Sequence, residues 1–219
     1  MSWDKEIEEL RQRQALGREM GGEEKVARQH KAGRLTVRER IDALLDPGSF
    51  REIGSITGAA GYDESGALVT FTPTNFVFGR GRIARRNVVV AGDDFTVRGG
   101  ASDASIIEKQ VAAEQMAHDL RLPLVRLVEG SGGGGSVKSL ESLGYTYVPY
   151  LPGWEFMVRN LATVPVVSLG LGPIAGFGAA KTVASHYCVL VRGQAQMFVA
   201  GPPVVAAAGQ KLTKEELGS

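Results

Sequence analysis

The stretch 164–180 reads VPVVSLGLGPIAGFGAA and sets a strand, a glycine-rich turn and a helix in direct succession. Valine and leucine dominate its first half, which predicts a strand over residues 164–171. The alanines that follow the glycines start a helical pattern, which we expect over residues 178–185. A strand that passes into a helix through a short turn is the repeating unit of an α/β protein.

The same succession recurs along most of the chain. Apolar runs predict strands at 76–78, 88–92, 124–128, 189–191 and 196–199, and amphipathic patterns predict helices at 105–120 and 154–161. The uninterrupted run VVVAG at 88–92 is typical of a strand that is buried on both faces. From this alternation alone we expect a layered α/β domain with a doubly wound sheet.

The first fifty residues differ in pattern: residues 2 to 46 are rich in charge and have apolar residues at helical spacing. Gly21 and Gly22 interrupt the pattern, and Asp46-Pro47-Gly48 ends it. Thr36 and Glu39 have the spacing of a capping box, which predicts a helix start. The basic stretch 25–34 is either a solvated helix face or a site for an anion or a partner. We therefore expect an N-terminal helical extension over residues 1–48 and one domain over residues 49–219.

Composition narrows the class of protein. The 219 residues carry 25 Lys and Arg against 24 Asp and Glu, a net charge of +1, which gives no reason to expect nucleic acid or an anionic membrane as a partner. No signal peptide or membrane-spanning run is evident, so we expect a cytoplasmic protein. The lone Cys188 forms no intrachain disulfide and is expected in the core, and the dispersed His30, His118 and His186 are expected to be structural or surface residues.

Glycine is the outlier, with 29 residues against a usual share of about 7%. Three glycine-rich segments, 98–100, 130–135 and 172–178, follow expected strands, where α/β proteins bind ligands. The backbone N–H groups near Gly176 to Gly178 form either a plain tight turn or a site for an oxyanion or phosphate. Their spacing matches neither a dinucleotide-binding fingerprint nor a P-loop. The run 130–136 is either a flexible linker or a ligand-facing loop, and its serines lack the context of a nucleophile.

Several longer motifs carry a family resemblance. The stretch QHKAGRLTVRERIDALLDPGSF at 29–50 resembles the start of the carboxyltransferase (beta) subunits of biotin-dependent acyl-CoA carboxylases, of the propionyl-CoA and methylcrotonyl-CoA types. Further matches follow in order: DFTVRGG at 94–100, SGG at 131–133, LGPIAG at 171–176, MFVAGP at 197–202 and LTKEELG at 212–218. They span nearly the whole chain.

This resemblance implies an α/β crotonase-like (ClpP/crotonase) fold, a spiral of ββα units behind the helical extension, instead of a doubly wound sheet. It implies that carboxybiotin on a partner releases CO2, that biotin takes the α-proton of an acyl-CoA, and that the enolate attacks CO2, with no metal in this chain. The implied catalytic residues are the oxyanion-hole segment Gly176, Phe177 and Gly178. The implied substrate-binding residues are Arg98, Gly99, Gly100, Ala101, Gly132, Gly133 and Gly134.

The chain departs from the family pattern at Phe177, where the family has a second glycine, and at Lys181 and His186. The family also continues into a second crotonase-like domain that is absent from these 219 residues. The resemblance therefore implies, as partners, a C-terminal carboxyltransferase domain chain and a biotin carboxylase or biotin carrier subunit, in a homo- or hetero-oligomer. A split enzyme, a fragment and a repurposed module all fit the sequence. The alternative functions are the carboxyltransferase of a biotin-dependent decarboxylase and a non-catalytic acyl-CoA-binding or assembly subunit.

Overall fold

The computed structural model describes residues 2–101, 106–130, 141, 144 and 153–219. Its helices are α1 Asp4–Arg18, α2 Glu23–Lys31, α3 Val37–Leu44, α4 Ile107–Leu120, α6 Trp154–Thr163, α7 Phe177–Val183, α8 Pro202–Ala207 and α9 Lys214–Gly218, with a short 3-10 turn, η1 Arg98–Gly100. Its strands are β1 Arg51–Ile53, β2 Gly58–Tyr62, β3 Leu68–Pro73, β4 Phe76–Ile83, β5 Arg86–Asp93, β6 Leu124–Gly130, β7 Val166–Ala175, β8 Tyr187–Leu190 and β9 Gln196–Phe198.

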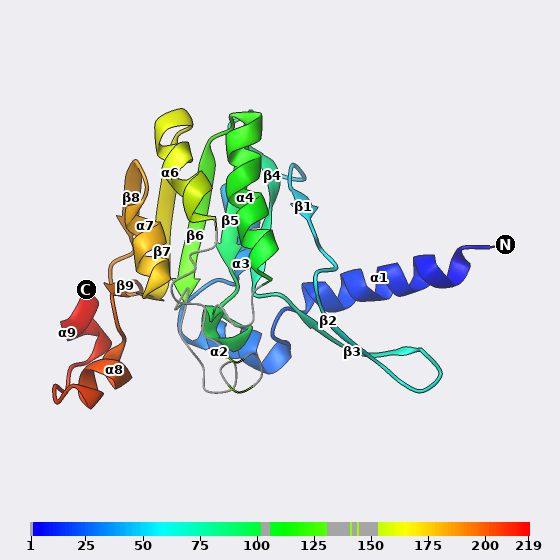
Figure 1. The fold of residues 1–219 in the computed structure, drawn as a ribbon, viewed down its shortest axis with the longest axis horizontal. Coiled ribbons are helices and arrows are strands. Elements are labelled where there is room, and N and C mark those ends of the chain that lie inside the picture. The colour runs from blue at the N-terminus through cyan, green and yellow to red at the C-terminus, as the bar shows by residue number, and fades with distance from the viewer. Residues whose placement is uncertain (1, 102–105, 131–140, 142–143, 145–152) are drawn as a thin grey trace.

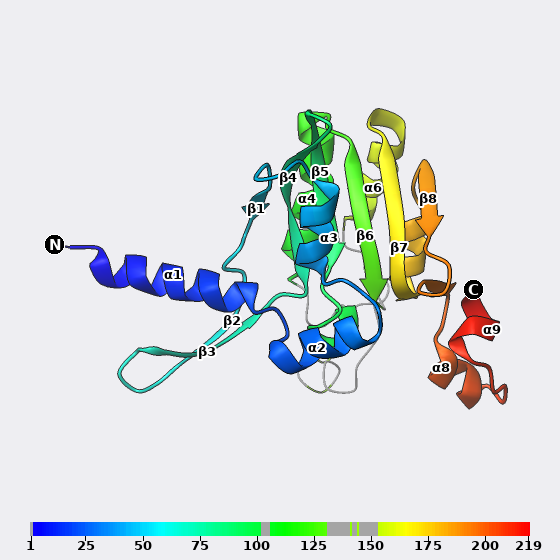
Figure 2. The same cartoon turned by 180° about the vertical axis from the view of Figure 1, so that it is seen from behind.

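A seven-stranded sheet forms the body of the molecule, in the order β1-β4-β5-β6-β7-β8, with β9 paired to β7. Strands β1, β4 and β5 pair antiparallel, whereas β5, β6, β7 and β8 pair parallel. Helices α4, α6 and α7, which connect the parallel strands, all cover the same face (Figure 1), and α3 covers the opposite face (Figure 2). A doubly wound sheet would have connecting helices on both faces, so that expectation from alternation alone is wrong.

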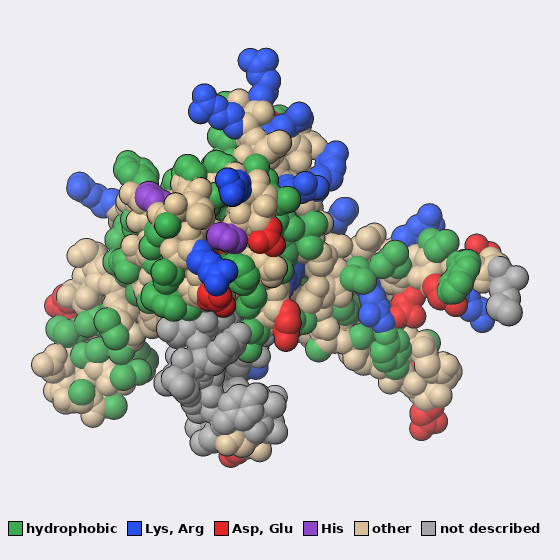
Figure 3. Space-filling view, turned by 45° about the horizontal axis from the view of Figure 1, so that its top comes forward, with side chains coloured by type: hydrophobic (Ala, Val, Ile, Leu, Met, Phe, Trp, Pro, Cys, Tyr) green, Lys and Arg blue, Asp and Glu red, His purple; other side chains and the backbone are tan. Residues whose placement is uncertain are grey.

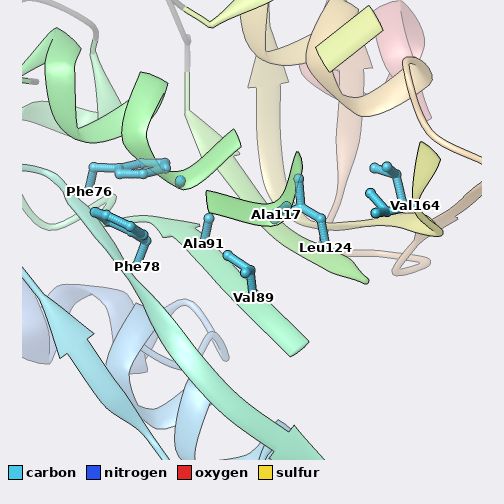
Figure 4. Close-up of a cluster of buried hydrophobic side chains, with 9 residues drawn as sticks. Phe76, Phe78, Val89, Ala91, Ala117, Leu124 and Val164 are labelled. Carbon is cyan, nitrogen blue, oxygen red and sulfur yellow. The ribbon is translucent and has the colours of Figure 1, made fainter. Parts of the chain in front are cut away.

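Alternating side chains of the central strands build two cores, one on each face of the sheet. Phe76, Phe78, Val89, Ala91 and Leu124 point toward α4, where they meet Ala113 and Ala117 (Figure 4). The intervening residues Val77, Val88, Val90, Val125 and Leu127 point toward α3 and its residues Val37, Ile41 and Leu45. This period of two, with both sides apolar, confirms that the 88–92 run is a strand buried on both faces.

The capping box predicted at Thr36 is present. The hydroxyl of Thr36 accepts a hydrogen bond from the backbone N–H of Glu39 at 3.3 Å, and the Glu39 carboxylate accepts one from the backbone N–H of Thr36 at 2.7 Å. The imidazole of His30 and the bonds from Thr36 lower the pKa of Glu39 to about 2. The cap therefore fixes where α3 begins, and with it the apolar face that α3 lays on the sheet.

Two sequence expectations about the last strands are wrong. Strand β7 runs to Ala175 instead of ending at residue 171, because its second half pairs with β9 after its first half has paired with β8. Cys188 is exposed and not in the core, because β8 is the last strand in the sheet order and most of its residues are exposed. An apolar run alone does not show whether a strand is central or at an edge.

Helix α1 and the β2–β3 hairpin project together from the body, in agreement between both ribbon views (Figures 1 and 2). The hydroxyl of Tyr62 donates to the Glu9 carboxylate at 3.1 Å, which joins the hairpin to the helix. None of the described helices is long and apolar enough to cross a membrane.

Replacing Thr36 by Ala should lower the free energy of unfolding by about 1 kcal/mol, because it removes the buried cap of α3. Denaturant unfolding of the purified chain measures this. Thr213→Ala is the matched control, since Thr213 caps α9 with the same capping box but α9 buries no residue. Equal changes in the two variants would show that the α3 cap does not support the core.

Candidate functional site

The carboxyl ends of three neighbouring parallel strands meet at one edge of the sheet, at the lower edge in Figure 1. Strand β5 ends at Asp93, β6 at Gly130 and β7 at Ala175. Ligands of open α/β sheets bind at this edge. The predicted convergence of glycine segments holds for the described part of the chain, because segments 98–100 and 176–178 and Gly130 all lie here.

Two glycine backbones touch at the centre of this edge. A Cβ atom on Gly100 would lie 2.6 Å from the carbonyl oxygen of Glu129, and one on Gly130 would lie 2.9 Å from the Cα of Gly100. Gly99 and Gly100 have φ of +63° and +66°, and Gly130 has φ of +142°. Any side chain at Gly100 or Gly130 would therefore separate η1 from β6. The predicted substrate-binding residues 98–101 lie directly beside the end of β6, whereas Gly132, Gly133 and Gly134 lie outside the described residues.

Gly176 makes the turn from β7 into α7. Its φ of +56° and ψ of −123° suit glycine, and its N–H donates to the carbonyls of Phe198 and Val199 at 3.2 and 3.0 Å. Gly176 is thus a turn residue whose own N–H is already engaged. Phe177 and Gly178 are the first residues of α7, where N–H groups have no partner within the helix. The buried ring of Phe177 packs toward Trp154, with 6.3 Å between ring centroids.

Sequence reasoning missed a buried carboxylate under this edge. Glu129 is completely buried. Its carboxylate forms ion pairs with Arg40 at 2.6 Å and Arg34 at 3.3 Å, and it accepts a hydrogen bond from the side-chain amide of Gln29 at 2.8 Å. Burial raises the pKa of Glu129, and the two guanidinium groups oppose that rise. Gly172 leaves the space for this carboxylate, since a Cβ there would lie 2.2 Å from its Oε1. The available signal was an acidic residue directly after an apolar strand.

The basic stretch 25–34 proves to have two roles. Gln29 and Arg34 turn inward to Glu129, whereas Lys25 and Arg28 are exposed. These residues line a cavity of about 290 Å³ beside the 98–100 turn; its lining is Lys25, Arg28, Gln29, Arg34, Phe95, Thr96, Arg98 and Gly99. The guanidinium of Arg34 lies 5.2 Å from the centre of the Phe95 ring. The stretch therefore supplies positive charge to a cavity at the ligand edge.

A second buried carboxylate connects two of the converging elements. Asp93 pairs through Oδ1 with the ammonium of Lys181 on α7 at 3.3 Å, and its Oδ2 accepts the backbone N–H of Glu129 at 3.3 Å. The C-terminal end of α7 is held by Arg126, which donates to the carbonyls of Lys181 and Ala184 at 2.9 and 2.7 Å. Arg126 is itself paired with Glu114. These contacts fix α7 relative to the end of β6.

The histidines have structural contacts, as expected. His186 accepts from the backbone N–H of Val166 and lies 2.9 Å from the carbonyl of Leu161, so it joins the end of α6 to β7. His30 lies 2.9 Å from the Glu39 carboxylate. Among the residues that the structure describes, no group of three His, Cys, Asp or Glu side chains is arranged to hold a metal ion.

Removing only one charge of the buried Asp93–Lys181 ion pair should destabilise the chain strongly. We expect Lys181→Met and Asp93→Asn each to lower the free energy of unfolding by about 3 kcal/mol or more, because each leaves a buried polar partner unpaired, and the double variant to lose less than the sum. Denaturant unfolding of the four proteins measures the coupling. Arg159→Met, which breaks the exposed pair with Glu155, is the control and should change stability by under about 0.5 kcal/mol. Strict additivity would contradict a direct Asp93–Lys181 interaction.

Known proteins share this sequence and this arrangement. The model of the carboxyl transferase domain family matches residues 28–219. The mitochondrial propionyl-CoA carboxylase beta chain of Sus scrofa is 34% identical over 225 residues, which cover 100% of this chain and 40% of the relative. The mitochondrial methylcrotonoyl-CoA carboxylase beta chain of Arabidopsis thaliana is 34% identical over 209 residues, which cover 90% of this chain and 33% of the relative.

Solved structures agree with the sequence matches. A transcarboxylase 12S hexamer with methylmalonyl-coenzyme A and methylmalonic acid bound superposes with a TM-score of 0.79 at 28% identity, covering 100% of this chain and 42% of that one. The geranyl-CoA carboxylase beta subunit of P. aeruginosa superposes with a TM-score of 0.71 at 28% identity, covering 99% of this chain and 38% of that one.

These likenesses confirm the crotonase-like α/β fold that the resemblance predicts, and the chain spans about two fifths of the length of most of these relatives. A family model that covers residues 28–219 includes the end of α2, α3, the sheet, η1 and α7. The chain belongs to the carboxyl transferase domain family.

Proposed function

We propose that this chain forms the acyl-CoA-binding part of the carboxyltransferase of a biotin-dependent acyl-CoA carboxylase. The observation that carries the proposal is the position of the start of α7, with Phe177 and Gly178, at the same edge of the sheet as the Gly100–Gly130 contact. Carboxyl transfer to an acyl-CoA passes through an enolate, and preorganised backbone donors are the groups that stabilise such an oxyanion. The glycine content of the edge serves this backbone chemistry.

In the proposed reaction the N–H groups of Phe177 and Gly178 bind the thioester oxygen, and the Gly176 turn orients them. The positive end of α7 adds to their effect. The carboxylates of Glu129 and Asp93 are both engaged with cations, so among the described residues neither is free to act as the base. In this proposal carboxybiotin, carried by a partner, would release CO2, and the biotin that remains would accept the α-proton of the acyl-CoA.

The cavity beside the 98–100 turn is proposed to hold the phosphates of coenzyme A. Lys25, Arg28, Arg34 and Arg98 bring positive charge to its walls, and Phe95 offers an aromatic face. Cations on a partly enclosed wall suit a ligand that carries several phosphates. Gly99 lies in this wall and Gly100 at the end of β6, so one short turn would connect the phosphate and thioester ends of the ligand.

The remaining parts of the enzyme are proposed by analogy with the relatives. A second carboxyltransferase domain and a biotin carboxylase or biotin carrier subunit would complete the active site, in an oligomer such as the transcarboxylase 12S hexamer. Within this chain, residues 1–48 would be an extension that covers one face of the domain 49–219, in line with the packing of α3 on the sheet.

Phe177→Pro and Phe177→Ala together test the oxyanion assignment. Both remove the ring, but only proline removes the N–H, and proline is compatible with the first position of a helix. Relative to Phe177→Ala, we expect Phe177→Pro to lower kcat by about 10²-fold to 10³-fold in the carboxyltransferase assembled with its biotin-carrying partner. Equal kcat values would refute the assignment. Acyl-CoA binding without transfer by the wild-type assembly would favour the non-catalytic alternative.

The double variant Lys25→Ser, Arg28→Ser tests the phosphate cavity. We expect its KM for the acyl-CoA to rise about tenfold, which is ~1.4 kcal/mol of lost binding, with kcat unchanged. Its KM for the matching acyl-pantetheine, which lacks the adenosine phosphates, should stay at the wild-type value. Lys5→Ser, Lys31→Ser is the control with the same charge change outside the cavity. An equal rise for both substrates would place the phosphates elsewhere.

A further inference from the structure

A concentration of arginine lies at the end of the sheet opposite the ligand edge. We define the arginine patch as Arg51, Arg80, Arg82, Arg85 and Arg86, all of which are exposed. In the described part of the chain, no Asp or Glu side chain forms an ion pair with any of them within 4.0 Å. Figure 3 shows Lys and Arg side chains gathered at the top of the molecule, with acidic side chains largely elsewhere. The near-neutral net charge conceals this local excess.

Strand pairing sets these charges against one another. Arg51 of β1 lies directly opposite Arg80 of β4, and Arg82 follows two residues later on the same face. Like charges that face each other across a strand pair destabilise a sheet. The Arg51 guanidinium also donates to the carbonyls of Gly48 and Phe50, both at 2.9 Å, which holds it in place. The fold therefore places two like charges opposite each other across a strand pair.

The turn that carries the patch is strained as well. Ala84 and Arg85 join β4 to β5 with φ of +48° and +66°, a conformation that tight hairpins reserve for Asn and Gly. The carboxylate of Asp46 accepts hydrogen bonds from the N–H groups of both residues, at 2.9 and 2.8 Å, and so stabilises the turn. Strain of this kind, held by a dedicated partner, is typical of functional sites.

Beside the turn lies an open groove of about 370 Å³, lined by Gly48, Ser49, Arg51, Arg80, Gly81, Arg82, Asn87 and Leu122. The cations of the patch are all arginine, whose planar fork binds carboxylates in a bidentate manner. The groove has no aromatic lining on which nucleic-acid bases could stack. These features together favour a carboxylate-rich ligand.

We propose that the arginine patch binds an acidic segment of a partner protein. Arg86 and Asp93 are the two ends of β5, so the patch and the ligand edge are separated by about 23 Å. An acidic partner seated on the patch therefore leaves the carboxyl edge of the sheet open. Binding at the arginine patch does not depend on the proposed carboxyltransferase function, and it can be measured without an activity assay.

The test uses a labelled peptide of alternating glutamate and serine as the probe, with the alternating glutamine and serine peptide as the neutral reference. Fluorescence anisotropy with the full chain at 0.15 M salt measures Kd. We expect the glutamate peptide alone to bind, and Arg80→Thr, Arg82→Thr to weaken it at least tenfold. Lys211→Ser, Lys214→Ser, an exposed pair with the same charge change, should stay within twofold of wild type.

Thermal unfolding separates lost binding from lost folding. Because Arg80 faces Arg51, we expect the melting temperature of Arg80→Thr, Arg82→Thr to equal or exceed that of wild type. If it falls, the double variant Arg85→Ser, Arg86→Ser, at the turn and at the start of β5, replaces it. The proposal fails if the glutamate peptide does not bind, if patch and control variants lose affinity equally, or if neither patch variant weakens binding. It also fails if a labelled oligouridylate binds more tightly than the peptide and is lost in the same variant.

Discussion

The buried carboxylate of Glu129 is the constraint on which the ligand edge depends. A charge with no exposed surface is tolerated only when it is paired and hydrogen-bonded, so Arg34, Arg40 and Gln29 must stay where they are. Those three residues come from α2, α3 and the loop between them, whereas Glu129 lies near the end of β6, about one hundred residues later. One ion cluster thus attaches the N-terminal region to the site. Gly172 must remain without a side chain for the same reason.

A second set of charges fixes the helix that presents the backbone donors. Lys181 reaches Asp93 from the middle of α7, and Arg126 holds the carbonyls at its end. Asp93 and Arg126 lie on the neighbouring parallel strands β5 and β6, so the seven-residue helix α7 is held directly against the sheet. Short helices are marginal on their own, which makes such external contacts necessary. Lys181 is thus one of the side chains that hold α7 in place.

The sequence predicted the parts of this protein that local rules govern. The capping box at Thr36, the doubly buried strand at 88–92 and the helix after Gly176 follow from spacing and periodicity. The family motifs supplied the crotonase-like topology, which alternation alone misassigned. Sequence reasoning did not predict three features, because each depends on a partner that is distant in the chain. Glu129 pairs with Arg34 and Arg40, and Asp93 pairs with Lys181. The length of β7 depends on its pairing with β9. The engagement of the Gly176 N–H with Phe198 and Val199 escaped for the same reason. Arg80 to Arg86 stand close in the sequence, but only strand register reveals that Arg51 joins them.

The contact between Gly100 and Gly130 also bears on how the gene can change. Each single-nucleotide missense change in a glycine codon introduces a residue with a Cβ atom, and the backbone of the other segment already occupies that space at both positions. Every one-step missense neighbour of either codon would therefore have to displace the backbone of the other segment. Silent substitutions are the single-nucleotide changes at these two codons that keep the backbone contact free of this steric cost.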